Sequence, residues 1–190
     1  MIINYLGNGS FKLQSGQTSL LVDAESNRFK ADVSLRTLVS ADLAPLSESS
    51  ANTEITFPGE YEVKGIEISG IGVSEESTDK FLKTVYLVHW EDIKLAFLGH
   101  ISKPLSPAII EKLDEPDVLF IPVGGGHFLP PEDAAKLAKK LEPSFIVPSF
   151  YKAPGDFLKA MGQKAETEEK LVFKKKDLEG TKNKVVVLKT

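Results

Sequence analysis

Residues 118–135 read VLFIPVGGGHFLPPEDAA and join an apolar segment to a helical one through three glycines. Val118 to Val123 contains almost no polar residue, which is typical of a buried strand. Pro131, Glu132 and Asp133 begin the helical segment, and the two carboxylates place negative charge at the positive end of the helix dipole. This stretch therefore predicts a strand, a glycine loop and a helix.

The segments on either side of this stretch follow two different patterns. Up to about residue 100, short β-type segments are separated by glycine and polar turns, as in hairpins. Beyond it, helices and strands alternate, and Ser106-Pro107 is typical of a helix N-terminus. We expect helices from about residues 106, 131 and 156, and strands at 2–6, 11–13, 19–22, 33–39, 54–57, 61–64, 67–71, 84–90, 93–98, 118–123, 145–148, 172–174 and 185–188.

The order of these elements predicts an α/β fold. Runs of strands followed by αβ units indicate two sheets packed face to face, with helices covering an outer face. We place the helices that begin near Ser106 and Pro131 on the same outer face. No internal repeat or clear linker divides the chain, so we expect residues 1–190 to form a single domain.

Composition excludes several classes of function. The net charge of −4 gives no reason to expect nucleic acid. The chain has no cysteine, which excludes disulfides, thiolate metal sites and thiol nucleophiles. The N-terminus lacks the features of a signal peptide, and no stretch approaches the roughly 20 apolar residues of a membrane span. We therefore expect a cytoplasmic protein without a membrane partner. Other partners are unknown, and a homo-oligomer is left open.

Several local patterns occur in a characteristic order. They are Ile2–Gly7 with Ser10-Phe11, Leu20-Leu21-Val22-Asp23, Pro58–Gly65, Leu95-Ala96-Phe97-Leu98-Gly99, Ile121–Gly125, Pro131–Ala135 and Val147-Pro148. Together they resemble the lactonase-like group of Zn-dependent hydrolases with the metallo-β-lactamase fold, over residues 1 to about 152. The resemblance implies a four-layer αββα sandwich of two mixed sheets.

The resemblance also assigns metal-ligand positions, and the residues there have changed. That family binds zinc through a His-X-His-X-Asp-His motif, two further histidines and a bridging aspartate. Here His100 occupies the bridging position, and the middle histidine falls near Ser74 or Glu75. The remaining positions hold Ala41, Leu43, Pro45, Leu46 and Phe150. Since zinc sites need at least three protein ligands, we expect no dinuclear zinc site and no cofactor, with a weak single metal ion left open.

Four polar residues are the candidates for a pocket: Asp23, Glu75, His100 and His127. The family's loops open at one end of the sandwich, so we expect Glu75, His100 and His127 near one cleft. Asp23 resembles the family's bracing aspartate, and we expect it to cap backbone N–H groups. The plainer interpretation is a structural His100, a surface His127 and solvated charges at Glu75 and Glu76. Residues 41–52 are predicted to form a shortened loop or a helical turn.

Three functional hypotheses follow. The first is a pseudoenzyme that keeps the fold for binding or interaction, with an apolar, partly filled pocket. The alternative is a metal-dependent hydrolase with a remodelled single-metal site that uses Glu75, His100 and His127. The third is a metal-free hydrolase or small-ligand sensor. The glycine loop lacks the Gly-Lys-Ser/Thr ending of a phosphate loop, and no G-x-S-x-G motif is present.

Overall fold

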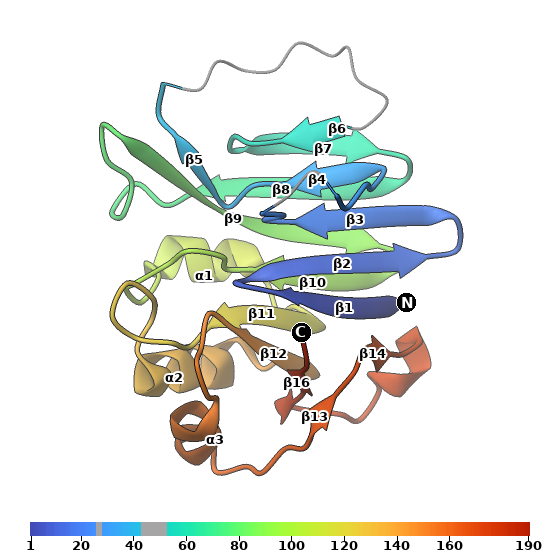
Figure 1. The fold of residues 1–190 in the computed structure, drawn as a ribbon, viewed down its shortest axis with the longest axis vertical. Coiled ribbons are helices and arrows are strands. Elements are labelled where there is room, and N and C mark those ends of the chain that lie inside the picture. The colour runs from blue at the N-terminus through green and yellow to red at the C-terminus, as the bar shows by residue number, and fades with distance from the viewer. Residues whose placement is uncertain (26–27, 43–52) are drawn as a thin grey trace.

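The computed structural model describes residues 1–25, 28–42 and 53–190, and two β-sheets lie face to face in it (Figure 1). The first sheet has six strands in the order β14-β1-β2-β3-β4-β6 and mixes antiparallel with parallel pairing. Its strands are β1 (Ile2–Gly7), β2 (Ser10–Ser15), β3 (Thr18–Val22), β4 (Val33–Leu35), β6 (Thr53–Ile55) and β14 (Leu171–Val172).

The second sheet is also mixed, with the order β15-β12-β11-β10-β9-β8-β7 and with β5 paired to β9. Strands β10, β11, β12 and β15 run parallel, whereas β7 to β10 form antiparallel hairpins. The strands are β5 (Leu38–Ser40), β7 (Gly59–Val63), β8 (Ile66–Gly72), β9 (Phe81–Trp90), β10 (Ile93–Phe97), β11 (Val118–Pro122), β12 (Phe145–Ser149) and β15 (Lys184–Val185).

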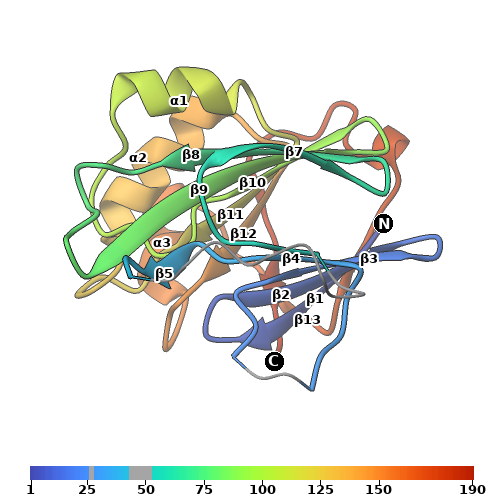
Figure 2. The ribbon, with the colours of Figure 1, turned by 90° about the horizontal axis from the view of Figure 1, so that it is seen from above.

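Three α-helices pack on the outer face of the second sheet (Figure 2). They are α1 (Pro107–Leu113), α2 (Pro131–Leu141) and α3 (Gly155–Met161). A short 3-10 helix η1 (Lys175–Asp177) and the paired strands β13 (Thr167–Glu168) and β16 (Val187–Leu188) complete the described elements. Within the described ranges, the outer face of the six-stranded sheet carries no helix.

Strand β10 shows why the second sheet is apolar on both faces. Side chains alternate along a strand, so Leu95 and Phe97 point between the sheets, while Ala96 and Leu98 lie under the helices. Phe97 stacks on Phe120 with ring centroids 4.3 Å apart, and Phe120 meets Phe11 of the first sheet edge-on at 4.7 Å. These rings join the two sheets into one core.

The predicted fold of two mixed sheets is confirmed, and so are helices beginning at Pro107 and Pro131 on one outer face. The predicted strand over residues 33–39 was wrong in one respect, because it divides into β4 and β5, which belong to different sheets. At the break, Thr37 N donates to the Asp23 carboxylate at the end of β3, whereas the Thr37 carbonyl accepts from Thr84 N of β9, so the chain passes from the first sheet to the second at Thr37. The predicted loop or helical turn at 41–52 lies almost wholly outside the described residues.

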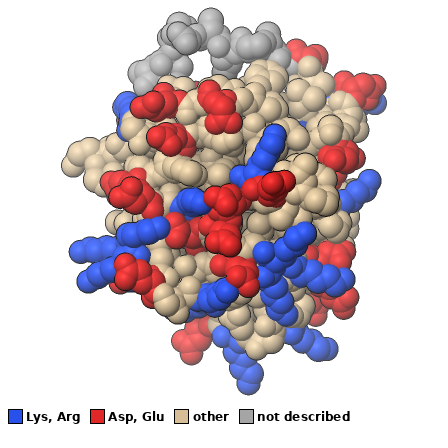
Figure 3. All heavy atoms as spheres, turned by 180° about the vertical axis from the view of Figure 1, so that it is seen from behind, with Lys and Arg blue, Asp and Glu red and all other residues tan. Residues whose placement is uncertain are grey.

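Charged side chains of both signs lie on the surface. On the face seen in Figure 3, Lys and Arg are interspersed with Asp and Glu, as the small net charge of −4 leads one to expect. None of the described helices is long and apolar enough to cross a membrane.

Candidate functional site

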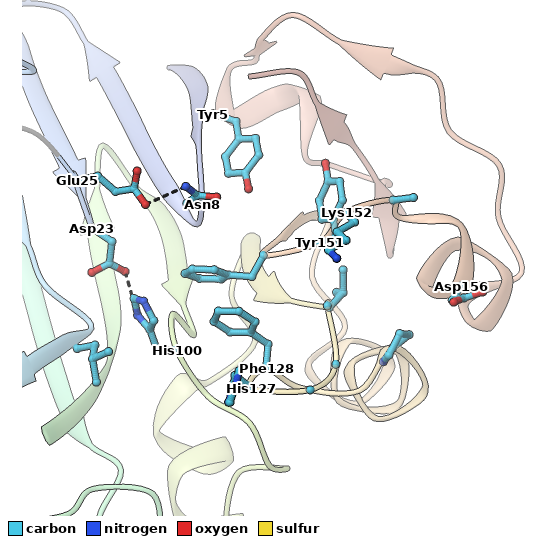
Figure 4. A pocket seen from close by; sticks show the side chains of 18 of the residues that line it. Tyr5, Asn8, Asp23, Glu25, His100, His127, Phe128, Tyr151, Lys152 and Asp156 are labelled. Carbon is cyan, nitrogen blue, oxygen red and sulfur yellow. Dashed lines mark hydrogen bonds and ion pairs between the residues drawn. The ribbon is translucent and has the colours of Figure 1, made fainter.

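A pocket of about 1150 Å³ opens at one end of the sandwich, where loops from both sheets meet (Figure 4). Strands β10, β11 and β12 are parallel, so the loops at their carboxyl ends lie at the same edge, which is where α/β proteins place their ligands. These loops bring His100, the glycine loop with Phe128, and Phe150 to the pocket. The first sheet contributes Tyr5, Asn8 and Asp23.

Asp23, Thr37 and His100 form a hydrogen-bonded chain at the pocket's inner wall. Thr37 N donates to Asp23 Oδ1 at 2.8 Å, and the Thr37 hydroxyl donates to Asp23 Oδ2 at 2.6 Å. Thr37 Oγ1 also lies 2.7 Å from His100 Nδ1, whereas Asp23 Oδ2 is 3.7 Å from that nitrogen. Asp23 and Thr37 are buried, and His100 is half-buried.

These hydrogen bonds select one tautomer of the neutral His100 imidazole. The Thr37 hydroxyl has a single hydrogen, which it donates to Asp23, so its oxygen accepts from His100 Nδ1–H. In the neutral ring, Nε2 is then the unprotonated acceptor. Burial lowers the pKa of His100 from its ordinary value of 6.5, although the Asp23 charge opposes that shift. Burial likewise raises the pKa of Asp23, while His100 and Thr37 oppose it.

Glycine at position 99 makes room for the hydrogen bonds between Asp23, Thr37 and His100. Its backbone has φ +54°, in the left-handed region, and a Cβ there would lie 2.1 Å from Thr37 Oγ1. No side chain other than hydrogen fits between the end of β10 and Thr37. Gly99 therefore lets His100 approach Thr37 closely.

Phe150 forms the aromatic wall of the pocket. Its ring stacks on Phe128 with centroids 4.2 Å apart and lies tilted against His100 at 4.7 Å. Phe150 has φ +53°, an uncommon conformation for a bulky residue, and two glycines accommodate it. A Cβ on Gly9 would lie 1.9 Å from the Phe150 ring, and one on Gly124 would lie 1.8 Å from its carbonyl oxygen.

Glu76 holds the segment that follows His100. Its carboxylate accepts hydrogen bonds from Ser102 N, Ser102 Oγ and Lys103 N at 2.6–3.0 Å, and Lys83 Nζ lies 2.8 Å away. The Glu76 side chain is 4% exposed. Burial raises the pKa of Glu76, but the bonds from Lys83, Ser102 and Lys103 outweigh burial and lower it overall.

Of the four candidate residues, the structure brings three to the pocket. Asp23, His100 and His127 line it, although His127 is exposed. Glu75 is not among the lining residues; it is exposed, and its side chain accepts a 3.3 Å hydrogen bond from Ser74 Oγ. Asp23 accepts a hydrogen bond from one backbone N–H, that of Thr37. His89 lies on β9, where its ring is 4.0 Å from Glu67.

Residue patterns alone did not reveal three residues of the site. Thr37 and Phe128 belong to no motif, and the sequence pattern predicts a solvated charge at Glu76. The buried hydrogen bonds of Thr37 reach 63 residues along the chain to His100, a separation that local patterns do not encode. The sequence likewise does not distinguish the buried side chain of Glu76 from the exposed one of Glu75, because only the folded loop makes them different.

The side chains of the described residues are not arranged to bind a metal ion as the resemblance implies. They contain no group of three or more His, Asp or Glu side chains placed to hold a metal ion. Residues 26–27 and 43–52, which the structure does not describe, contain no histidine and one acidic residue, Glu48. His100 Nδ1 and both Asp23 oxygens are occupied by Thr37. Ala41 is described, and Leu43, Pro45 and Leu46 lie outside the described residues.

The arrangement of sheets, helices and pocket is that of the metallo-β-lactamase fold. Residues 2–149 match the beta-lactamase superfamily domain, and the chain belongs to that family. A Thermotoga maritima protein assigned to the Zn-dependent hydrolases of the metallo-β-lactamase superfamily is 25% identical, with a TM-score of 0.78, covering 98% of this chain and 97% of that chain.

Two further relatives are more distant. A UPF0173 metal-dependent hydrolase of Methanopyrus kandleri is 27% identical over 106 residues, which is 52% of this chain and 46% of the relative; the match thus spans under half of that protein. The metallo-β-lactamase-fold protein YhfI of Bacillus subtilis shares the fold at a TM-score of 0.67 and 12% identity, covering 100% of this chain and 96% of that one.

The imidazole state leads to a prediction for the His100 titration. Since burial lowers its pKa, the His100 ring is expected to titrate with a midpoint below 6.5. The unfolded chain then binds more protons between that midpoint and pH 6.5, so this group lowers stability as the pH falls through the window. An NMR titration of the imidazole carbon-bound protons measures the midpoint. Asp23→Asn is expected to lower it further, because the Asp23 charge raises it; a midpoint above 6.5 contradicts the prediction.

Proposed function

We propose that this chain is a small-molecule-binding member of the beta-lactamase superfamily and that it does not act as a zinc hydrolase. The observation that carries the proposal is the Phe150 ring. By the resemblance, Phe150 stands at the last zinc-ligand position, and it stacks on Phe128 beside His100. A phenyl ring cannot ligate zinc, but it offers a flat apolar surface to a ligand.

The shape and lining of the pocket support a binding role. Its volume of about 1150 Å³ is slightly larger than that of typical small-molecule sites, which combine apolar walls with a few oriented polar groups. Phe128, Phe150 and Tyr5 provide the apolar walls, and His100 provides an oriented polar group. Asp23 and Thr37 brace that group through the hydrogen bonds of the Thr37 hydroxyl.

A metal-dependent hydrolase with a remodelled single-metal site is the second candidate. The observation that favours it is that relatives in two organisms carry hydrolase names. Such a site needs three protein ligands. Glu75 lies outside the pocket lining, so His100 and His127 would need a third ligand from elsewhere.

Zinc content distinguishes the two candidates. We expect the protein, purified without an affinity tag and dialysed against a weak chelator, to hold no stoichiometric zinc. Isothermal titration with zinc is expected to give the same weak response for the wild type and His100→Ala. Stoichiometric zinc that is lost in His100→Ala but kept in His89→Ala, a matched control on β9, would establish the hydrolase candidate instead.

A further inference from the structure

We infer that the pocket selects a flat, neutral molecule that carries an N–H or O–H donor, and that His100 Nε2 accepts the hydrogen bond from that donor. This inference rests on the proposed binding function and names the class of ligand. The juxtaposition that carries it is an oriented acceptor beside an aromatic face. His100 provides the acceptor, and the stacked Phe128 and Phe150 rings provide the face.

The first step concerns the free edge of the imidazole. Nδ1 is held by Thr37, and the geometry of the ring directs Nε2 away from Nδ1. Among the described residues, no side chain or backbone group bonds Nε2, and Nε2 is not one of the buried unpaired atoms. Because His100 lines the pocket and is 23% exposed, this acceptor is available to a ligand. Arginine or lysine in its place could only donate.

The second step concerns the aromatic face. The planes of Phe128 and Phe150 differ by 19°, so the two rings are nearly parallel. Both side chains are half-buried, which leaves part of each ring open to the pocket. The left-handed backbone of Phe150 and the missing side chain of Gly9 keep its ring in this orientation. Aromatic rings pack in offset-stacked or edge-to-face contact, so the wall favours a planar ligand.

The third step concerns charge. Two charged side chains at the inner end of the pocket, Arg36 and Glu25, already have partners, and Figure 4 shows the contact of Glu25 with Asn8. Arg36 binds Glu54 and the carbonyl of Ala24, and Glu25 accepts a bond from Asn8. Lys152 and Asp156 line the exposed part and carry opposite signs. At the inner end of the pocket, a neutral ligand therefore needs no charge partner, whereas an ion would compete with the contacts of Arg36 and Glu25.

The test compares indole with 1-methylindole, which differ by the N–H donor. Titration calorimetry at pH 7.5 is expected to show indole binding about tenfold more tightly, which is the effect of one hydrogen bond. His100→Phe keeps a flat ring and removes the acceptor, so both compounds should bind it equally. His89→Phe makes the same change at a histidine on β9 that does not line the pocket, and it should keep the preference for indole.

The outcomes separate the inference from the proposed function. Equal binding of both compounds to the wild type overturns the inference and leaves a binding pocket in place. This comparison needs no variant, so it does not depend on whether a variant folds. A preference that survives in His100→Phe places the acceptor elsewhere and also overturns it. Binding of neither compound at millimolar concentration overturns both the inference and the proposed aromatic binding site.

Discussion

Replacing Glu76 by alanine is expected to lower the free energy of unfolding by about 3 kcal/mol, the lower end of the cost of breaking a buried ion pair. The side chain is 4% exposed, and its partner Lys83 is 18% exposed. The substitution leaves the Lys83 ammonium without its carboxylate and removes the acceptor of Ser102 N and Lys103 N. Since these residues follow His100, the loop that carries His100 loses its anchor.

Glu75→Ala is the matched control for this change. Glu75 is the same residue type one position earlier, but it is exposed and bonds the side chain of its neighbour Ser74. Its replacement is expected to change stability by less than about 0.5 kcal/mol. Urea unfolding of both variants at pH 7, with the slope against urea compared as well as the midpoint, measures the difference. Equal losses in the two variants would show that Glu76 does not anchor the loop.

The pKa of Glu76 predicts how the stability difference between the wild type and Glu76→Ala depends on pH. Hydrogen bonds lower the pKa of Glu76 in the folded protein below its ordinary value of 4.5. A lowered carboxylate pKa contributes stability that is fully present above pH 4.5 and is lost as the pH falls through the folded value. The stability gap between the wild type and Glu76→Ala is therefore expected to narrow below pH 4.5. A constant gap from pH 7 to pH 3 would rule out a charged Glu76 as the cause.

Replacing Gly99 by alanine is expected to lower the free energy of unfolding by about 3 kcal/mol. Roughly 1–2 kcal/mol comes from a side chain in the left-handed region, where Gly99 has φ +54°. The rest comes from Thr37, because the new Cβ would lie 2.1 Å from Thr37 Oγ1 and displace it from Asp23. A buried carboxylate that loses such a bond costs about 1–3 kcal/mol.

Gly16→Ala separates the two contributions. Gly16 has φ +55°, almost the same backbone, but nothing lies within 4 Å of its would-be Cβ. It is expected to lose only the backbone contribution, about 1–2 kcal/mol. The additional loss of stability in Gly99→Ala then measures the contact with Thr37. Of the two glycine variants, only Gly99→Ala should lose the preference for indole. Equal losses in the two glycine variants would show that Thr37 adapts without losing its bond to Asp23.

Much of the architecture was readable from local patterns. Alternating apolar residues around Gly65 and around Glu91-Asp92 specify hairpins, because the turn residues and the strand period are adjacent in the chain. Pro107 and Pro131 mark helix starts for the same local reason. The residues at the ligand positions that the resemblance assigns, such as Ala41 and Phe150, could also be read, because short flanking patterns define those positions.

The site itself was decided by the tertiary structure. Glu75 and Glu76 are chemically identical neighbours, yet one is exposed and the other receives bonds from residues 26 and 27 positions away. Thr37 forms a hydrogen bond with His100, which is 63 residues away in the sequence. The bond forms because the chain passes from the first sheet to the second after β4, next to the end of β10. The stack of Phe128 on Phe150 likewise joins loops after two parallel strands. Local propensity acts over a few residues, whereas strand order and loop closure choose such partners, so these contacts form only when the tertiary structure brings distant loops together.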